Sequence, residues 1–248
     1  MNMGNLLKRL SYLAVLGFPL SVLSKRLGVF GWEAGLTGVK YTLFLAAVVF
    51  LLSLVCWLAQ RESNPKGSKA AKLAMILSLL PLLGIGWQIV QVKRQSLPSI
   101  HNISTDTINP PQFSRIAELR TKEDNSLEYQ TSLLADVQTK AYPNIKTLIT
   151  DLTAREAHRI ALGIASYFDW EIVSENVVAG LIEATETTQL WAFKDDVVIR
   201  ITERPQGGSA IDMRSVSRVG ISDLGANAKR IEKFMAEFQA REDKRLDG

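Results

Sequence analysis

The sequence predicts N-terminal transmembrane helices followed by an α+β domain, in which two helices cover one face of a four-stranded antiparallel sheet. Residues 41–59 and 73–92 are apolar runs without a single charged residue, which indicates a membrane region. The last part of the chain reads as a helix, four strands and a second helix. Two one-sided helices pack most simply on one face of an antiparallel sheet, giving two layers. We therefore expect a membrane region (1–94), an extended connecting segment (95–152) and a soluble α+β domain (153–248).

The two charge-free runs are long enough to cross a bilayer. They contain 19 and 20 residues, and a hydrocarbon core roughly 30 Å thick needs about 20 helical residues. A shorter run, residues 10–24, lies between two pairs of basic residues and contains Pro19. We interpret it as an uncleaved first span, because no small-residue cleavage site follows it; a signal peptide is the alternative. The sequence thus predicts two or three transmembrane helices.

The positive charge of the chain is concentrated in the membrane region. Residues 1–94 contain 11 Lys and Arg and 2 Asp and Glu, whereas the remaining residues contain 18 and 23. The rest of the chain is therefore mildly acidic, which argues against a general nucleic-acid-binding surface. The single cysteine, Cys56, lies inside an apolar run, so there is no disulfide framework and no cysteine-based metal site.

The distribution of basic residues among the loops predicts the side of the membrane that the domain occupies. With three spans, the N-terminus and the loop 60–72 share one side and carry six Lys and Arg, against five on the other side. Cytoplasmic loops are enriched in these residues. We therefore expect an integral membrane protein with its domain outside the cytoplasm. If residues 10–24 do not span, the domain faces the cytoplasm instead.

Both helices of the soluble domain have a recognisable start. Thr153 and Glu156 have the spacing of a capping box, and apolar residues then recur at three- and four-residue intervals. We place His158 off this apolar stripe and expect its side chain to be exposed. Ser222 or Asp223 is expected to cap the second helix.

Four strands are predicted between the two helices. They cover residues 170–175, 181–187, 197–204 and 210–219, and short turns join them into two hairpins. Because alternate side chains of a strand face opposite sides of the sheet, Val197, Ile199 and Ile201 share one face with Ile211 and Met213. We expect this apolar face to meet the helices.

The opposite face of the predicted sheet gathers charged residues. Alternation places there Arg200, Asp212, Arg214 and Arg218. In one interpretation they form a solvated ladder of ion pairs. In a second they form a binding site, because arginine suits carboxylate and phosphate groups. In a third, the connecting segment lies across the face through His101 and Asp106. These two residues and the four above are therefore the candidates for ligand or partner binding.

No catalytic residue, metal or cofactor is predicted. The two histidines, His101 and His158, lack metal-ligand spacing, and the sequence contains no nucleophile elbow, P-loop or dinucleotide-binding fingerprint. Asp195 and Asp196 are adjacent, but neighbours on a strand point to opposite faces, so they do not form a carboxylate pair.

Several strings of the sequence carry a family resemblance. They are HNISTDTINPPQF, AYP, IEATETT, DDVVIRI and DMRSVSRVGISDLGANAKRI, and they lie within residues 101–240. Together they resemble the bacterial domain-of-unknown-function family 1499. The resemblance implies a membrane-associated domain, and it brings no activity, fold or catalytic residues with it.

These observations, together with the resemblance, favour a non-enzymatic bacterial inner-membrane protein whose domain, on the periplasmic side, binds a partner or an anionic ligand through the arginine-rich face of the sheet. The expected partners are the lipid bilayer and a membrane or envelope protein, and nucleic acid is not expected. Two alternatives stay open. One is a membrane-anchored hydrolase or lipid-modifying enzyme that uses His101 and Asp106 beside the arginines. The other is a lipid carrier with an apolar cavity between helices and sheet.

Overall fold

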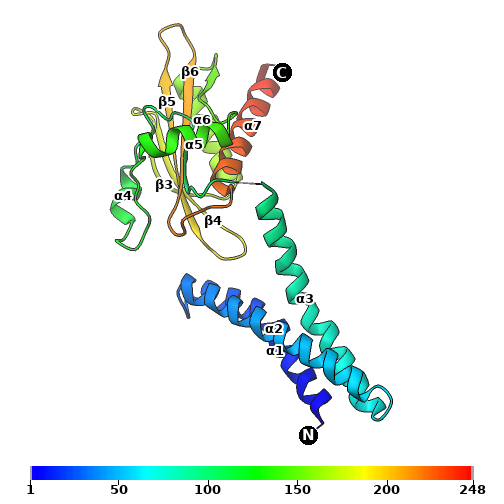
Figure 1. The fold of residues 1–248 in the computed structure, drawn as a ribbon. Helices are drawn as coiled ribbons and strands as arrows, with labels where there is room; N and C mark the ends of the chain where they lie inside the picture. Colours follow the sequence, from blue (N-terminus) through cyan, green and yellow to red (C-terminus); the bar gives the residue numbers. More distant parts are fainter. Residues whose placement is uncertain (1, 96, 247–248) are drawn as a thin grey trace. The chain divides into compact units, whose positions relative to one another are not determined.

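The computed structural model describes residues 2–95 and 97–246, which form two compact units. The first unit comprises the chain as far as Gln95 together with Leu190–Ala192. The second comprises Leu97–Gln189 and continues from Phe193. Figure 1 shows long helices in the first unit and a sheet with its covering helices in the second.

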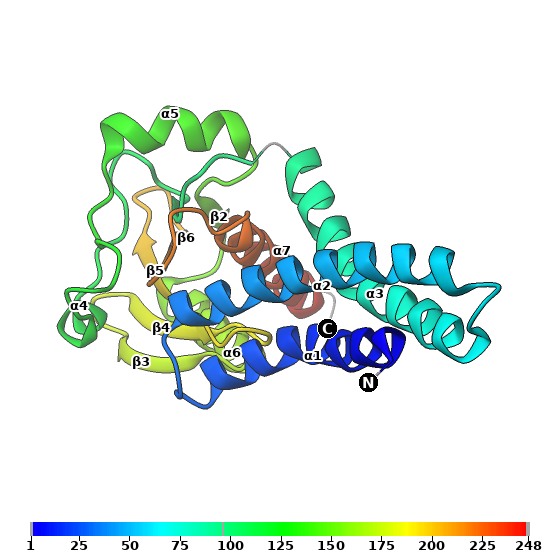
Figure 2. The same ribbon diagram turned by 60° about the horizontal axis from the view of Figure 1, so that its bottom comes forward.

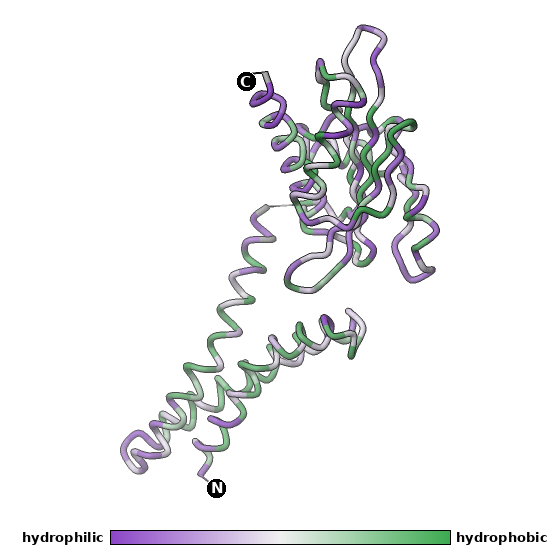
Figure 3. Tube along the Cα trace, turned by 180° about the vertical axis from the view of Figure 1, so that it is seen from behind, coloured by the Kyte–Doolittle hydropathy of each residue, from purple (hydrophilic) through white to green (hydrophobic). Residues whose placement is uncertain are grey.

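The first unit consists of helices that can span a membrane. These are α1 (Met3–Arg26), α2 (Trp32–Gln60) and α3 (Pro65–Gln95). Within the described residues, three helices are long and apolar enough to cross a bilayer, and Figure 3 shows their apolar central turns. The predicted first span, residues 10–24, lies within α1, which contains Pro19 in its interior. The structure thus agrees with a membrane protein that has three spans.

Small residues allow the three membrane helices to pack closely. Ser11 of α1 and Ala46 of α2 are fully buried, and a Cβ added to Gly4 would lie 2.4 Å from the carbonyl oxygen of Gly67 in α3. Close backbone approach of this kind is typical of helix contacts in membranes. Large apolar side chains point outward instead: Phe44, for example, is 70% exposed, as expected for a surface in contact with acyl chains.

The second unit is an antiparallel sheet with helices. Its elements in chain order are β1 (Asn102–Ser104), α4 (Arg115–Leu119), α5 (Thr131–Ala141), β2 (Leu148–Thr150), α6 (Ala154–Tyr167), β3 (Glu171–Asn176), β4 (Leu181–Thr187), β5 (Lys194–Glu203), β6 (Ser209–Ser217) and α7 (Ala226–Leu246). The strand order is β1-β6-β5-β4-β3, and β2 also pairs with β6. The α+β class is confirmed.

The prediction of a four-stranded sheet was wrong. The sheet contains six strands within the described residues. The four predicted strands correspond to β3–β6, whereas β1 and β2 belong to the connecting segment. Each of these two strands has three residues, which is too short to show the alternation on which the prediction depended.

The core of the second unit lies between the sheet and the helices α6 and α7. Ile164 of α6 and Phe234 and Phe238 of α7 pack with Ile199 and Met213 of the sheet, and all five are fully buried. Burial of each such side chain stabilises the fold by about 1.5–3 kcal/mol. The apolar face predicted from alternation is therefore the face that meets the helices.

The helix starts are set by the residues that the sequence indicated. Thr153 and Glu156 form the capping box of α6, as predicted. The carboxylate of Asp223 accepts hydrogen bonds from the backbone N–H groups of Gly225 (2.8 Å) and Asn227 (2.9 Å) at the start of α7. Of the two predicted capping residues, Asp223 therefore caps the helix. Burial raises the pKa of this carboxyl group.

The prediction that His158 is exposed was wrong. Its side chain is buried, and Nδ1 lies 3.7 Å from Oε1 of Glu175 in β3. His158 is three residues before Ala161 and seven before Ala165, so it lies on the buried stripe of α6 rather than beside it.

Candidate functional site

The charged candidates lie on the side of the sheet that faces away from α6 and α7, which we call the arginine face. Cross-strand pairing places Arg200 opposite Asp212 and Val198 opposite Arg214, and it places Glu183 of β4 opposite Val198. The arginine face comprises Glu183, Thr185, Asp196, Val198, Arg200, Asp212, Arg214 and Val216, with Arg218 directly after β6.

The arginine face is covered by the protein itself. Residues 105–130, which we call the covering segment, lie across it, and Figure 2 shows α4 of this segment beside β3 and β4. As a result Asp196, Val198 and Arg214 are fully buried, and Asp212 is 5% exposed. The arrangement matches the interpretation in which the connecting segment is held by the arginines.

Arg214 is the centre of this contact. Its guanidinium group donates hydrogen bonds to Oδ1 of Asn102 (3.0 Å), to the carbonyl oxygen of Pro111 (3.1 Å) and to that of Leu127. The three acceptors are neutral oxygen atoms, and two of them belong to the backbone of the covering segment. This buried cation therefore joins two distant parts of the covering segment to the sheet.

Aromatic rings complete the surroundings of this cation. The rings of Phe113 and Tyr129 have their centres 5.4 and 5.6 Å from the guanidinium carbon of Arg214, within the range of a cation–π contact. Burial lowers the pKa of Arg214 to about 10, and burial likewise raises the pKa of Tyr129 to about 12. Arg214 remains charged at neutral pH.

A second contact joins the covering segment to Asp196. Its carboxylate accepts hydrogen bonds from Arg120 of the covering segment (2.7 Å), from Arg218 (2.9 Å to each oxygen) and from Thr185 (2.7 Å). Burial alone would raise the pKa of Asp196, but the bonds from Arg218 and Thr185 and the charge of Arg120 hold it below its ordinary value. Asp196 is thus a buried anion with its hydrogen-bonding capacity filled.

Glu183 makes the third contact. Its carboxylate accepts hydrogen bonds from the backbone N–H groups of Ser114 (2.9 Å), Arg115 (3.0 Å) and Ile116 (2.7 Å). These groups belong to the first turn of α4, which has no capping bond from the side chain of Ser114. A carboxylate of the sheet therefore takes the place of the usual cap and fixes α4.

The remaining charged candidates form a group that solvent reaches. Nη2 of Arg200 donates to Asp106 (3.0 Å) and to Asp212 (2.8 Å), and the other oxygen of Asp212 accepts from Thr105 and Thr147. The side chains of Arg200 and Asp106 are 21% and 24% exposed. Because two carboxylates already surround one guanidinium group, this group is not suited to a further anion. Ligand binding by the six candidates stays a prediction.

His101 lies apart from these residues. Pairing of Asn102 with Val216 places His101 opposite Ser217, roughly 17 Å along β6 from Asp212 at 3.4 Å per residue. Asn102 faces Arg214, so the neighbouring His101 points to the other side of the sheet, where Nδ1 lies 3.2 Å from the carbonyl oxygen of Ile221. The structure does not bring together the residues that the hydrolase hypothesis requires.

A second buried cluster was missed. Arg230 of α7 donates hydrogen bonds to Asp195 (2.6 Å), Ser215 (2.9 Å), Asn227 and Glu186. The sequence contained a signal for it, because Asp195 alternates with residues of the apolar face, and a buried carboxylate needs a cationic partner. Arg120 gave no such signal, since it lies in an irregular stretch without periodicity.

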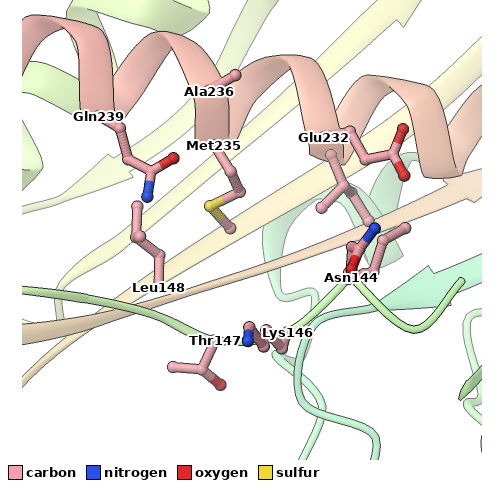
Figure 4. A pocket seen from close by; sticks show the side chains of 10 residues that line it. Asn144, Lys146, Thr147, Leu148, Glu232, Met235, Ala236 and Gln239 are labelled. Carbon is pink, nitrogen blue, oxygen red and sulfur yellow. The ribbon is translucent and has the colours of Figure 1, made fainter.

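An accessible groove lies at the edge of the core. It runs between α7 and residues 144–148, has a volume of about 250 Å³, and is called the α7 groove. Figure 4 shows Met235 pointing from α7 into this space, with Leu148 opposite it and Thr147 pointing away. The groove is lined by Asn144, Ile145, Lys146, Thr147, Leu148, Ile231, Glu232, Met235, Ala236 and Gln239.

Comparison with known families identifies the second unit. The sequence model of a family described as "Protein of unknown function (DUF1499)" matches residues 102–238, more than half of the chain. The chain belongs to this family. Among curated proteins, none matches the chain. The DUF1499 match starts at β1, so the covering segment lies inside the matched residues. Within the described residues, no group of three or more His, Cys, Asp and Glu side chains could hold a metal ion.

Replacement of Arg214 tests the role of the buried cation. Arg214→Met leaves three buried oxygen atoms without a donor, and we expect it to destabilise the DUF1499 domain by about 3–5 kcal/mol. The change should lower the melting temperature of the full chain in detergent and accelerate protease cleavage within residues 105–130. Arg115→Met is the control, because the exposed side chain of Arg115 pairs with the exposed Glu118, and an effect below about 1 kcal/mol is expected. Equal cleavage rates in the two variants would contradict this role.

Proposed function

We propose that this DUF1499 protein is a membrane-anchored, non-enzymatic binding module whose domain binds an extended segment of a partner protein in the α7 groove. One observation carries the proposal: an unpaired sheet edge lies at the end of an apolar groove. Domains that bind peptides by adding a strand combine these two features, since the edge supplies main-chain hydrogen bonds and the groove accepts side chains.

Backbone alternation shows that the edge of β2 is open. The N–H group of Thr105 donates to the carbonyl oxygen of Met213 at 3.0 Å, so the odd-numbered residues of β6 bond toward the side of β1 and β2. Leu148 and Thr150, which pair with the odd-numbered residues Ile211 and Ser209, therefore bond to β6. The N–H and C=O groups of Ile149 point away, and within residues 97–246 no strand pairs with them.

The lining of the α7 groove suits a segment with an apolar side chain between polar ones. Ile231 and Met235 supply an apolar floor from α7. Lys146 and Glu232 place one charge of each sign at the exposed rim. A partner segment with mixed charge fits this rim better than a strongly basic or acidic one.

The arginine face is a less favourable location for a partner. A ligand could reach Asp196 or Arg214 only after displacing the covering segment, which would leave buried charges without their hydrogen bonds. Breaking such buried pairs costs about 3–5 kcal/mol each. This cost favours binding at the α7 groove, which is accessible without any rearrangement.

Filling the groove tests the proposal. A photo-crosslinking amino acid at Gln239, on the exposed rim, should give one discrete adduct in cells that express the full chain. Ala236→Trp fills the groove and should reduce the adduct by about tenfold or more, corresponding to a loss of at least 1.4 kcal/mol. Ala240→Trp is the matched control, because Ala240 is exposed on the same helix and does not line the groove; it should leave the adduct unchanged. An adduct that survives Ala236→Trp would contradict the proposal.

We further propose that the protein resides in a bacterial inner membrane and that its domain is periplasmic. Three spans place the two ends of the chain on opposite sides of the membrane, and the basic loop between α2 and α3 favours the cytoplasmic side. Alkaline phosphatase fused after Gly248 should be active, because it requires the periplasm, whereas green fluorescent protein at the same position should be dark. The reverse pattern would place the domain in the cytoplasm.

A further inference from the structure

We propose that a second pocket, at the start of α7, binds the phosphate headgroup of an anionic phospholipid. The pocket has a volume of about 390 Å³ and lies within the second unit. We call it the lysine pocket; its lining includes Phe168, Trp170, Glu186, Lys229, Arg230 and Lys233. The proposal does not depend on the α7 groove, which lies on other residues of the helix.

Lys229 and Lys233 supply the positive charge of the lysine pocket. They lie four residues apart on α7, so both face the same side of the helix. Both side chains are exposed, and in the part of the chain that the structure describes neither forms an ion pair. Arg230 differs, because Asp195 and Glu186 neutralise its buried guanidinium group. The two ammonium groups are therefore available to an anionic ligand.

The floor of the lysine pocket is aromatic. Trp170 is 5% exposed, its ring lies 5.6 Å from that of Phe168, and Nζ of Lys233 lies 4.3 Å from the centre of the Phe168 ring. A cationic rim over an aromatic floor matches a ligand that joins a phosphate group to an apolar body. Free phosphate would use the rim and leave the floor without a contact.

The bilayer that the membrane helices of the chain enter is a source of such a ligand. The membrane helix α3 ends at Gln95, and β1 of the domain begins at Asn102. This short connection keeps the domain at a high effective concentration relative to the lipid headgroups. Lysine residues near an anionic membrane surface add to membrane affinity. The lysine pocket is therefore assigned to an anionic phospholipid rather than to another amphiphile with a phosphate group.

Hydrogen exchange in the full chain tests this site. The chain is placed in nanodiscs of phosphatidylcholine, in nanodiscs that also contain phosphatidylglycerol, and in phosphatidylcholine nanodiscs with inorganic phosphate added. We expect phosphatidylglycerol to slow amide exchange in residues 226–233, and Lys229→Gln with Lys233→Gln to reduce this protection by about tenfold or more. The control pair, Lys140→Gln with Lys244→Gln, removes the same charge from exposed positions outside the pocket and should keep the protection.

Three results would overturn the proposal. Equal exchange in the two kinds of nanodisc would show that the pocket does not bind an anionic headgroup in preference to a zwitterionic one. Equal loss of protection in the control pair would show a general attraction of lysine residues to an anionic surface. Equal protection by inorganic phosphate would assign the lysine pocket to free phosphate instead of lipid. Because none of these results involves Ala236 or Gln239, each leaves the proposed partner groove to be judged on its own test.

Discussion

The charges of the arginine face can be buried only while the covering segment is in place. Asp196 and Arg214 are fully buried, and an isolated buried charge is strongly unfavourable. The covering segment supplies their hydrogen-bond partners. Arg120 donates to Asp196, and the carbonyl oxygens of Pro111 and Leu127 accept from Arg214. Buried pairs of this kind add little net stability to the fold when both partners are present. Removal of one partner strongly destabilises the fold, because the other charge is left buried without a partner. Such pairs therefore favour one docked position of the segment over any partly open one.

This constraint decides where binding can occur on the domain. The covering segment occupies one face of the sheet, and α6 and α7 occupy the other, so the central part of each face is buried. The edge beside β2 and the outer side of α7 are among the surfaces that stay accessible. The α7 groove and the lysine pocket lie there, on residues that take no part in holding the covering segment. A ligand can reach both without breaking the contacts on which the fold depends.

The sequence predicted the parts of the molecule that repeat a pattern. The apolar runs predicted the spans, alternation separated Val197 and Ile199 from Arg200, and the capping box predicted the start of α6. Strand alternation also placed Arg200, Asp212 and Arg214 correctly on one face of the sheet. What the sequence could not predict is what covers that face, because residues 105–130 are irregular and carry no period. Contacts such as Arg214 with Leu127 join residues 87 positions apart, and no local signal specifies them. The error at His158 is of a different kind. Its spacing from Ala161 and Ala165 indicates a buried position, yet the side chain was predicted to be exposed.

The central claim is that the covering segment buries the middle of the arginine face, around Asp196, Val198 and Arg214, in the intact protein. Thiol labelling of the full chain measures this directly, with the native Cys56 replaced by serine. Val198 lies in the middle of the arginine face and is fully buried, whereas Val178 in the β3–β4 turn is 100% exposed. A cysteine at Val198 should react at least about 100-fold more slowly than one at Val178, because labelling then requires local opening that costs several kcal/mol. Comparable rates at the two positions would show that the face is open and would contradict this account.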